Sequence, residues 1–284
     1  MTATPTAASA GSTCLVAVLL KRVDLWPAVD PLTGAASPDP HGGLSPADRC
    51  ALELALRHAA ALSTSVLAVS AGPAAAEEVL REALAAGAAR AVRVDLPAGT
   101  PSADAAVALT PALAGCAFVW CGDHSLDGGS GSVPAFVAGD LAAEQALGLT
   151  AVDLADPAAL RVQRRLDGGR RELLRVRAPA VLSVEAGLAS PRRPALAAVL
   201  AAGRAPIQVL AAPLRPPVPA GRLAAFRPRA RALPGPDPAL SPRERLLALS
   251  GALVAREPPR VVHAEPGAAA EEVLAFLRAR GQLG

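Results

Sequence analysis

Leu15-Val-Ala-Val-Leu-Leu20 is the stretch that decides the fold class of this chain. It is a short, continuous apolar run, which is typical of a strand buried on both faces of a parallel sheet. Similar runs follow at Ser65-Val-Leu-Ala-Val-Ser70, Ala91-Val-Arg-Val94 and Gly115-Cys-Ala-Phe-Val-Trp-Cys121. We therefore expect four strands of one sheet in this part of the chain.

Helical patterns separate these strands. The first follows Ser45-Pro46-Ala47-Asp48, where Ser suits the N-cap, Pro the first helical position and an acid the first turn. Further helices are expected after Gly72-Pro73, over residues 102–113 and over residues 133–147. Strands that alternate with helices across short loops predict an α/β fold with a doubly wound, open parallel sheet.

The pattern changes after residue 150. Asp167-Gly-Gly-Arg170 separates two polar–apolar runs and predicts a β-hairpin. Pro179-Ala-Val-Leu-Ser-Val184 predicts another buried strand. Residues 211–242 are rich in Pro and Arg and indicate an extended arm, with helices expected over 242–255 and 268–280. The predicted organisation is a disordered tail (1–13), an α/β domain (14–210) and a C-terminal arm with helices (211–284).

Composition excludes several function classes. Aromatic residues make up 2% of the chain and Tyr is absent, so a nucleic-acid stacking platform is not expected. No apolar run approaches the roughly 18 residues of a membrane span, so no membrane insertion is expected. The run ending at Leu20 has no preceding basic region, which argues against a signal peptide and for a cytoplasmic protein. Four Cys without a C-x-x-C pair argue against a structural metal site.

The most informative segment for chemistry is Cys121-Gly-Asp-His-Ser-Leu-Asp-Gly-Gly-Ser-Gly-Ser-Val-Pro134. It follows a predicted buried strand and leads into a predicted helix, which is where ligands bind in doubly wound sheets. Glycines let the backbone approach a phosphate, while backbone N–H groups, Ser hydroxyls and the helix N-terminus favour it. The segment favours phosphate binding, with a surface loop of turn residues as the alternative.

Other catalytic patterns are missing. The chain has no G-x-x-x-x-G-K-[ST], no G-x-G-x-x-G after the first strand and no G-x-S-x-G. His124, Ser125 and Asp127 lie in one loop, whereas members of a catalytic triad converge from separate elements. The remaining histidines share no ligand spacing and are interpreted as surface or cap residues; they are His41, His58 and His263. We therefore expect no catalytic residue and no metal site.

Several segments, in the same order and spacing, resemble the beta subunit of electron-transfer flavoproteins. They are Lys21-Arg22-Val23, the stretches 53–57, 67–73, 81–90, 121–133, 164–169 and 179–184, Ser190-Pro-Arg192, and the C-terminal 270–278. No single motif carries the resemblance; the ordered set does, across most of residues 14–210 and the last helix.

The resemblance implies an adenine-nucleotide-binding type of the doubly wound fold. It also implies a heterodimer with an alpha subunit that supplies most FAD contacts, AMP as a structural ligand, and electron relay from a flavin-dependent dehydrogenase. The beta subunit would have no bond-making catalysis of its own, and its arm and C-terminal helices would contact the partner subunit. The AMP contacts would fall on Leu19, Ser45, Pro46, Ala47, Asp48, Ala71, Gly122, Asp123, His124, Ser125, Leu126, Asp127, Gly128, Gly129, Ser130, Gly131, Ser132 and Val133.

Two further roles follow from the resemblance. Trp26 is the best aromatic candidate to face the flavin, with packing on the domain surface as the alternative. A loop that docks dehydrogenases would fall on Leu188, Ala189, Ser190, Pro191 and Arg192, with a plain strand-to-helix turn as the alternative.

The chain departs from the family at both sites. Asp123-His124 stands where Lys-Gln is common, and Ala189-Ser-Pro-Arg192 replaces Asn-Glu-Pro-Arg. The altered docking loop suggests a specialised dehydrogenase partner, for which the mycofactocin-associated branch is one candidate. The competing hypothesis is a nucleotide-binding regulatory module of the same fold without flavin.

Overall fold

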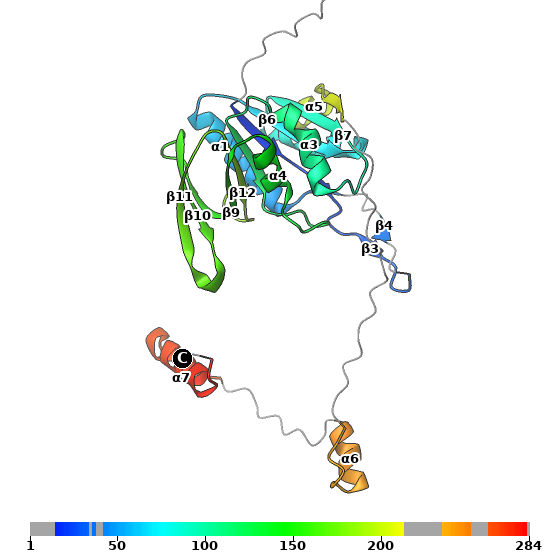
Figure 1. Cartoon of the computed structure of the whole chain (residues 1–284), viewed down its shortest axis with the longest axis vertical. Coiled ribbons are helices and arrows are strands. Elements are labelled where there is room, and N and C mark those ends of the chain that lie inside the picture. Colours follow the sequence, from blue (N-terminus) through cyan, green and yellow to red (C-terminus); the bar gives the residue numbers. More distant parts are fainter. Residues whose placement is uncertain (1–14, 34–35, 38–41, 213–234, 251–260, 283–284) are drawn as a thin grey trace, which may run out of the picture. The chain divides into compact units, whose positions relative to one another are not determined.

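The computed structural model describes residues 15–33, 36–37, 42–212, 235–250 and 261–282 (Figure 1). The chain divides into two compact units, Met1–Pro217 and Val218–Gly284. The tail predicted over residues 1–13 and most of the predicted arm, residues 213–234, lie outside the described residues. No helix in the described part of the chain is long and apolar enough to span a bilayer.

A nine-stranded sheet forms the centre of the first unit, in the order β11-β10-β9-β12-β8-β1-β6-β7-β13. Its strands are parallel except that β10 runs antiparallel to both β9 and β11. Their bounds are β1 Val16–Leu19, β6 Val66–Gly72, β7 Arg90–Asp95, β8 Phe118–Gly122, β9 Glu144–Asp153, β10 Ala159–Arg165, β11 Arg171–Arg177, β12 Ala180–Val184 and β13 Gln208–Ala211. The predicted parallel strands and the predicted hairpin are confirmed.

Two short ribbons lie between β1 and the first helix. β2 (Arg22–Val23) pairs antiparallel with β5 (Gly43–Leu44), and β3 (Ala28–Val29) pairs antiparallel with β4 (Ala36–Ser37).

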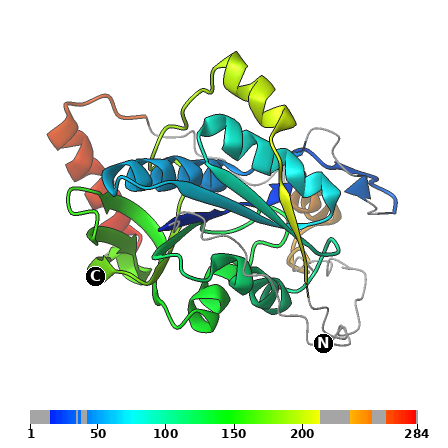
Figure 2. The same cartoon turned by 90° about the horizontal axis from the view of Figure 1, so that it is seen from above.

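Helices cover both faces of the sheet, as Figure 2 shows. The bounds are α1 Pro46–Ala61, α2 Glu77–Ala86, α3 Ser102–Leu113, α4 Val133–Asp140 and α5 Leu196–Arg204, with a 3₁₀ turn at Ala74–Ala76. Successive side chains of β1 point to opposite faces of the sheet, so the strand contributes to two hydrophobic clusters. Val16 and Val18 pack with residues of α1 and α2, whereas Ala17 and Leu19 pack with residues of α3 and α4. This arrangement confirms the doubly wound α/β fold.

One helix is shorter than the sequence indicates. The helix predicted over residues 133–147 ends at Asp140, Ala142 takes a φ of 51°, and β9 begins at Glu144. β9 pairs with β12 on one side and β10 on the other, which buries Ala146 and Leu149 completely. Pairing of Glu144, Gln145 and Ala146 with β12 thus overrides the local helical tendency of this segment.

Two helices are described in the second unit. α6 (Pro242–Leu249) begins with a capping box formed by Ser241 and Glu244, and α7 spans Pro266–Ala279. α6 starts where predicted but ends at Leu249, while residues 251–255 of the predicted helix lie outside the described residues.

Candidate functional site

The sheet order reverses at β1, which lies between β8 and β6. β1 runs parallel to β8 with Leu19 opposite Cys121, so both strands end at the same edge of the sheet. Ligands of open α/β sheets bind outside the carboxyl ends of the strands at such a reversal. The edge beyond Leu19 and Cys121 is therefore the first place to look for a site.

Asp48 of α1 joins the ends of these two strands. Its Oδ2 accepts the backbone N–H of Lys21 and its Oδ1 accepts that of Gly122, each at 3.2 Å. The side chain is buried, and burial raises the pKa of the carboxyl group to about 7 although both N–H donors oppose the rise. Asp48 therefore changes charge near neutral pH at the point where β1, β8 and α1 meet.

The start of α1 is built as the sequence predicts. Ser45 Oγ accepts the backbone N–H of Asp48 at 3.0 Å, and Pro46 is the first helical residue. Gly122 lies so close to this turn that a Cβ on it would be 2.5 Å from Asp48 Oδ1 and 3.1 Å from the Cβ of Ala47. Glycine at this position lets the end of β8 close against α1.

The loop between β8 and α4 is a compact turn of residues 123–132. The N–H of Gly129 donates to the carbonyl of Ser125 at 2.9 Å. Gly131 has a φ of +59°, and a Cβ there would lie 2.6 Å from the carbonyl oxygen of Asp123. Only glycine fits that position without moving the backbone.

Polar side chains crowd the same loop. Ser130 Oγ lies 2.9 Å from Ser132 Oγ and 3.4 Å from Ser102 Oγ at the start of α3. His124 Nδ1 lies 2.9 Å from Asp123 Oδ1. Leu126 is half exposed beside them. The loop thus presents hydroxyls and backbone N–H groups at the edge of the sheet where a ligand is expected.

Lys21, to which the sequence analysis assigned no role, lies against this loop. It is the only lysine of the chain. Its Nζ donates to Asp127 Oδ1 at 2.8 Å and lies 3.5 Å from Ser125 Oγ. The signal that could have found it is its place two residues after the end of β1, at the edge of the sheet where ligands bind.

The remaining predicted AMP contacts lie at the ends of β1 and β6. Leu19 belongs to the buried cluster under α3 and α4, and the partly buried Ala71 packs against this cluster. Beside Ala71, the buried hydroxyl of Ser70 has no hydrogen-bond partner among the described residues. Ser70 lies two residues before the end of β6, and a buried polar atom without a partner there fits a ligand that supplies one.

Trp26 lies away from both core clusters, in the segment between β2 and β3. Its side chain is 84% exposed. The indole face is therefore accessible to a planar ligand or to a partner, and its role stays a prediction.

The predicted docking loop is held by α1. The N–H of Ala189 donates to Cys50 Sγ at 3.2 Å. The N–H and Nε of Arg192 donate to the carboxylate of Glu53 at 3.2 and 2.7 Å, and Arg57 Nε donates to the same carboxylate at 2.7 Å. Burial acts to raise the pKa of Glu53, but the two arginines outweigh it and hold that pKa below its usual value. The sequence predicts the pair of Glu53 with Arg57, which is confirmed, but not the contact of Glu53 with the loop.

The exposed apolar surface next to this loop belongs to α5. Leu188 is only partly exposed because it packs against the core. Leu196, Val199 and Leu200 are 74%, 45% and 60% exposed and share one face of α5 by their spacing. Arg81 holds the C-terminal end of this helix by donating to the carbonyl of Ala202 at 2.9 Å.

The family model for the electron transfer flavoprotein domain matches residues 36–214, which is more than half of the chain. The chain belongs to this family. It is 30% identical over 187 residues to the bovine (Bos taurus) electron transfer flavoprotein subunit beta, an alignment that covers 63% of this chain and 72% of the bovine protein. The beta subunit of Syntrophomonas wolfei is 31% identical over 172 residues, covering 60% and 68% of the two chains. The beta subunit of Mycobacterium bovis is 33% identical over 166 residues, covering 56% and 62%. The chain is therefore a beta-type electron transfer flavoprotein.

In this electron transfer flavoprotein chain, the interpretation of His58 as a surface or cap residue is wrong. Its side chain is fully buried, its Nδ1 accepts Trp120 Nε1–H at 3.2 Å, and its Nε2 lies 2.8 Å from the carbonyl oxygen of Pro157. Because the indole can only donate, Nε2 must carry the proton and donate to Pro157. Burial lowers the pKa of His58, which favours this neutral form.

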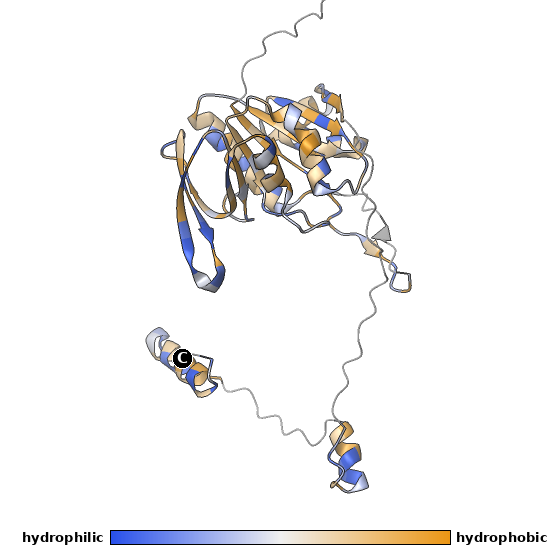
Figure 3. Ribbon diagram, viewed as in Figure 1, coloured by the Kyte–Doolittle hydropathy of each residue, from blue (hydrophilic) through white to orange (hydrophobic). Residues whose placement is uncertain are grey.

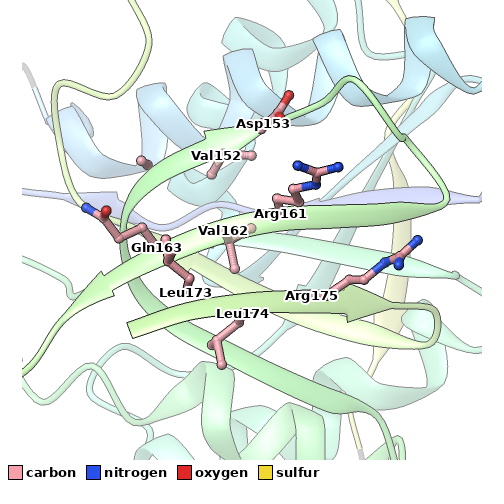
Figure 4. A pocket seen from close by; sticks show the side chains of 9 residues that line it. Val152, Asp153, Arg161, Val162, Gln163, Leu173, Leu174 and Arg175 are labelled. Carbon is pink, nitrogen blue, oxygen red and sulfur yellow. The ribbon is translucent and has the colours of Figure 1, made fainter. Parts of the chain in front are cut away.

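A hollow of about 450 Å³ lies at the antiparallel edge of the nine-stranded sheet, where β9, β10 and β11 pair (Figure 4). Residues 151–153 of β9, 161–163 of β10 and 173–175 of β11 line it and are adjacent in register. The hairpin β10–β11 is largely hydrophilic toward its tip (Figure 3), yet Leu173 within it is 79% exposed. None of the site residues predicted for the family lines this hollow.

Among the residues that the structure describes, no group of three or more His, Cys, Asp or Glu could hold a metal ion.

Proposed function

We propose that this chain is the beta subunit of a heterodimeric electron-transfer flavoprotein that binds AMP as a structural ligand and helps an alpha subunit to hold FAD. The pair would take electrons from a flavin-dependent dehydrogenase and pass them to a downstream acceptor. The observation that carries the AMP part is the close approach of β8, α1 and the glycine loop at the reversal of the sheet. Membership of the electron transfer flavoprotein family carries the rest.

The residues at this edge have the chemistry that AMP requires. Backbone N–H groups of the loop and the N-terminus of α4 suit a phosphate. The buried Ser70 hydroxyl has no partner among the described residues and suits a polar group of the ligand. Because β1 and β8 end here and α1 begins here, a ligand bound at this edge would stabilise three elements at once.

FAD supplies the redox chemistry of such a pair when it is bound. We assign no bond-making role to any side chain of this chain. Its contribution would be to shape one wall of the flavin environment, with the exposed Trp26 as the candidate aromatic contact.

A docking surface for the dehydrogenase is proposed at the predicted loop, residues 188–192, together with the neighbouring face of α5. The loop is held in one conformation by Glu53, and the exposed side chains of Leu196, Val199 and Leu200 provide apolar area beside it. Rigid apolar groups within a polar rim are typical of the centre of a protein interface. The altered sequence of the loop would select a specialised partner.

The first experiment is co-expression with the matching alpha-type subunit, followed by a visible spectrum and nucleotide analysis of the purified material. A one-to-one complex that contains FAD and AMP supports the proposal. A colourless protein that holds a nucleotide even with the alpha subunit present would favour a regulatory nucleotide-binding module of the same fold. A flavin-containing complex without any AMP would overturn the AMP assignment alone.

A further inference from the structure

The glycine loop carries its own negative charge. Asp127 Oδ1 accepts the ammonium of Lys21 at 2.8 Å and the backbone N–H of Gly128 at 2.6 Å. An ammonium group and a loop N–H are the two kinds of donor that a bound phosphate oxygen takes in glycine-loop sites. One carboxylate oxygen therefore makes the contacts of an anion at this loop.

The charges of the loop favour a cation beside a bound phosphate. Residues 122–133 include Asp123 and Asp127 but no Lys or Arg. A phosphate brought to this loop would be repelled by both carboxylates unless a positive group lay beside it. Lys21 is the cation that the structure ties directly to the loop.

The ion pair is suited to exchange of partners. The side chains of Lys21 and Asp127 are 48% and 51% exposed, so the pair contributes little to stability and opens at little cost. Burial acts to raise the pKa of Asp127, but bonds from Lys21, Ser125 and Gly128 outweigh it and lower that pKa, so the carboxylate is ionised at neutral pH. A phosphate with nearly two charges and three acceptor oxygens is the stronger partner for an ammonium.

We propose that Lys21 is the cationic contact for the AMP phosphate, and that the carboxylate of Asp127 holds the lysine and the Gly128 N–H in place until the phosphate displaces it. This inference rests on the proposed AMP site. It adds Lys21, which is not among the AMP contacts that the resemblance implies, and it assigns Asp127 the role of a competitor in place of a ligand contact.

The single lysine makes a selective test possible. Reductive methylation with ¹³C places a dimethyl label on Lys21, which is distinguishable from the terminal amine. The full chain, freed of nucleotide, is then titrated with AMP, adenosine or FAD while the label is followed by NMR. We expect the Lys21 signal to shift with AMP and to stay in place with adenosine. A shift with FAD and none with AMP would overturn the inference by assigning the lysine to the flavin.

Variants show whether Lys21 contacts the AMP phosphate or only stabilises the loop. Lys21→Gln is expected to weaken AMP binding on the order of tenfold, with adenosine affinity unchanged, and Lys21→Arg to retain most of it. Asp127→Asn keeps an acceptor for the Gly128 N–H but removes the competing charge, so AMP should bind several-fold more tightly. Arg165→Gln, which breaks an exposed pair with Glu185 elsewhere, is the control and should leave AMP affinity unchanged.

The outcomes also distinguish this inference from the proposed function. If both Lys21→Gln and Asp127→Asn weaken AMP and adenosine equally, the ion pair only braces the loop and the inference is wrong. If the unmodified chain binds neither AMP nor adenosine, alone or with its alpha subunit, the nucleotide site itself fails.

Discussion

Gly122 shows how little space separates β8 from α1. A methyl group on it would come within 2.5 Å of a carboxylate oxygen and 3.1 Å of a backbone nitrogen of Asp48. We expect Gly122→Ala to destabilise the chain by about 1–3 kcal/mol, the usual cost of overpacking, and to weaken AMP binding. Denaturant unfolding measures the first effect and nucleotide titration the second.

The matched control is Gly139→Ala. Gly139 lies in α4, has an ordinary φ, and a Cβ there would meet nothing within 4 Å. Because alanine favours helices, this variant should be neutral or more stable by about 0.5–1 kcal/mol. Equal behaviour of the two variants would show that the end of β8 can move away from α1.

Asp48 predicts an unusual pH dependence. Its folded pKa of about 7 lies above the value of 3.8 expected for an exposed carboxyl group, so the folded state binds a proton more tightly. Its contribution to stability is fully present below pH 4 and is lost as the pH rises toward 7. Relative to Asp48→Asn, the native chain should lose about 2–3 kcal/mol of unfolding free energy between pH 5 and pH 8. Urea unfolding of both proteins at the two pH values measures the difference.

His58 changes the free energy of unfolding with pH in the opposite direction to Asp48 over part of this range. Burial lowers its pKa, so below about pH 6.5 the unfolded state binds a proton that the folded state does not. Its contribution therefore falls as the pH falls, and it flattens the profile of the native chain. Comparison with Asp48→Asn cancels this effect because His58 is present in both proteins. A constant difference between the two proteins across the range would mean that Asp48 is ionised when folded.

Single residues also mark the limit of sequence-based prediction. The cap formed by Ser45 was predictable because its partner lies three positions away. The burial of His58 was not, because its partners Trp120 and Pro157 are 62 and 99 positions distant. The same holds for Lys21, whose partner Asp127 is 106 positions away. Local signals identified the loop, whereas its charged contacts required the three-dimensional fold.

Among the elements, α1 has two functional regions. Its N-terminus carries Asp48 at the nucleotide edge, and its middle carries Glu53, whose 5% exposed carboxylate holds Arg192 and Arg57. We expect Glu53→Gln to lower stability by about 1–3 kcal/mol, since bonds to a charged, buried acceptor weaken or are lost. Tryptic cleavage after Arg192 should accelerate, and electron transfer from the dehydrogenase should slow while FAD content is kept.

The control for Glu53→Gln is an Arg–Glu ion pair that is more exposed. Arg165 and Glu185 lie 2.8 Å apart but are 64% and 33% exposed. Glu185→Gln should therefore cost less than about 1 kcal/mol and leave cleavage at Arg192 unchanged. If Glu53→Gln behaves like this control, the loop is held by its other contacts, including Ala189 with Cys50.

The prediction of strands and helices succeeded where the local sequence pattern determines the structure. It failed where pairing with a strand distant in sequence determines it. The bounds of α3 agree with the prediction because no strand competes for residues 102–113. Residues 144–147 continue the helix predicted for this segment, yet they become strand because β12 pairs with Glu144, Gln145 and Ala146. The antiparallel pairing of β9 with β10 was likewise beyond local signals, because sheet order depends on contacts that are distant in sequence.

At the scale of the whole molecule, the two C-terminal helices have no buried residue. Isolated helices of 8 and 14 residues are marginal in water, and most helical stability in proteins comes from packing an apolar face. In α7, Val273, Phe276 and Leu277 recur at helical spacing, and Val273 and Phe276 are 57% and 54% exposed. We infer that the alpha subunit covers this face.

Substitution on that face tests the inference without touching either core cluster, because both clusters lie within residues 16–212. Phe276→Ser and Leu277→Ser should each weaken the heterodimer at least tenfold, as expected for buried interface anchors. Thermal unfolding of the chain alone should not change. Glu271→Ser, at an exposed position of the same helix, is the control and should leave affinity for the alpha subunit unchanged. Unaltered affinity in the first two variants would assign subunit contact to the α/β unit alone, and titration calorimetry with the purified alpha subunit distinguishes these results.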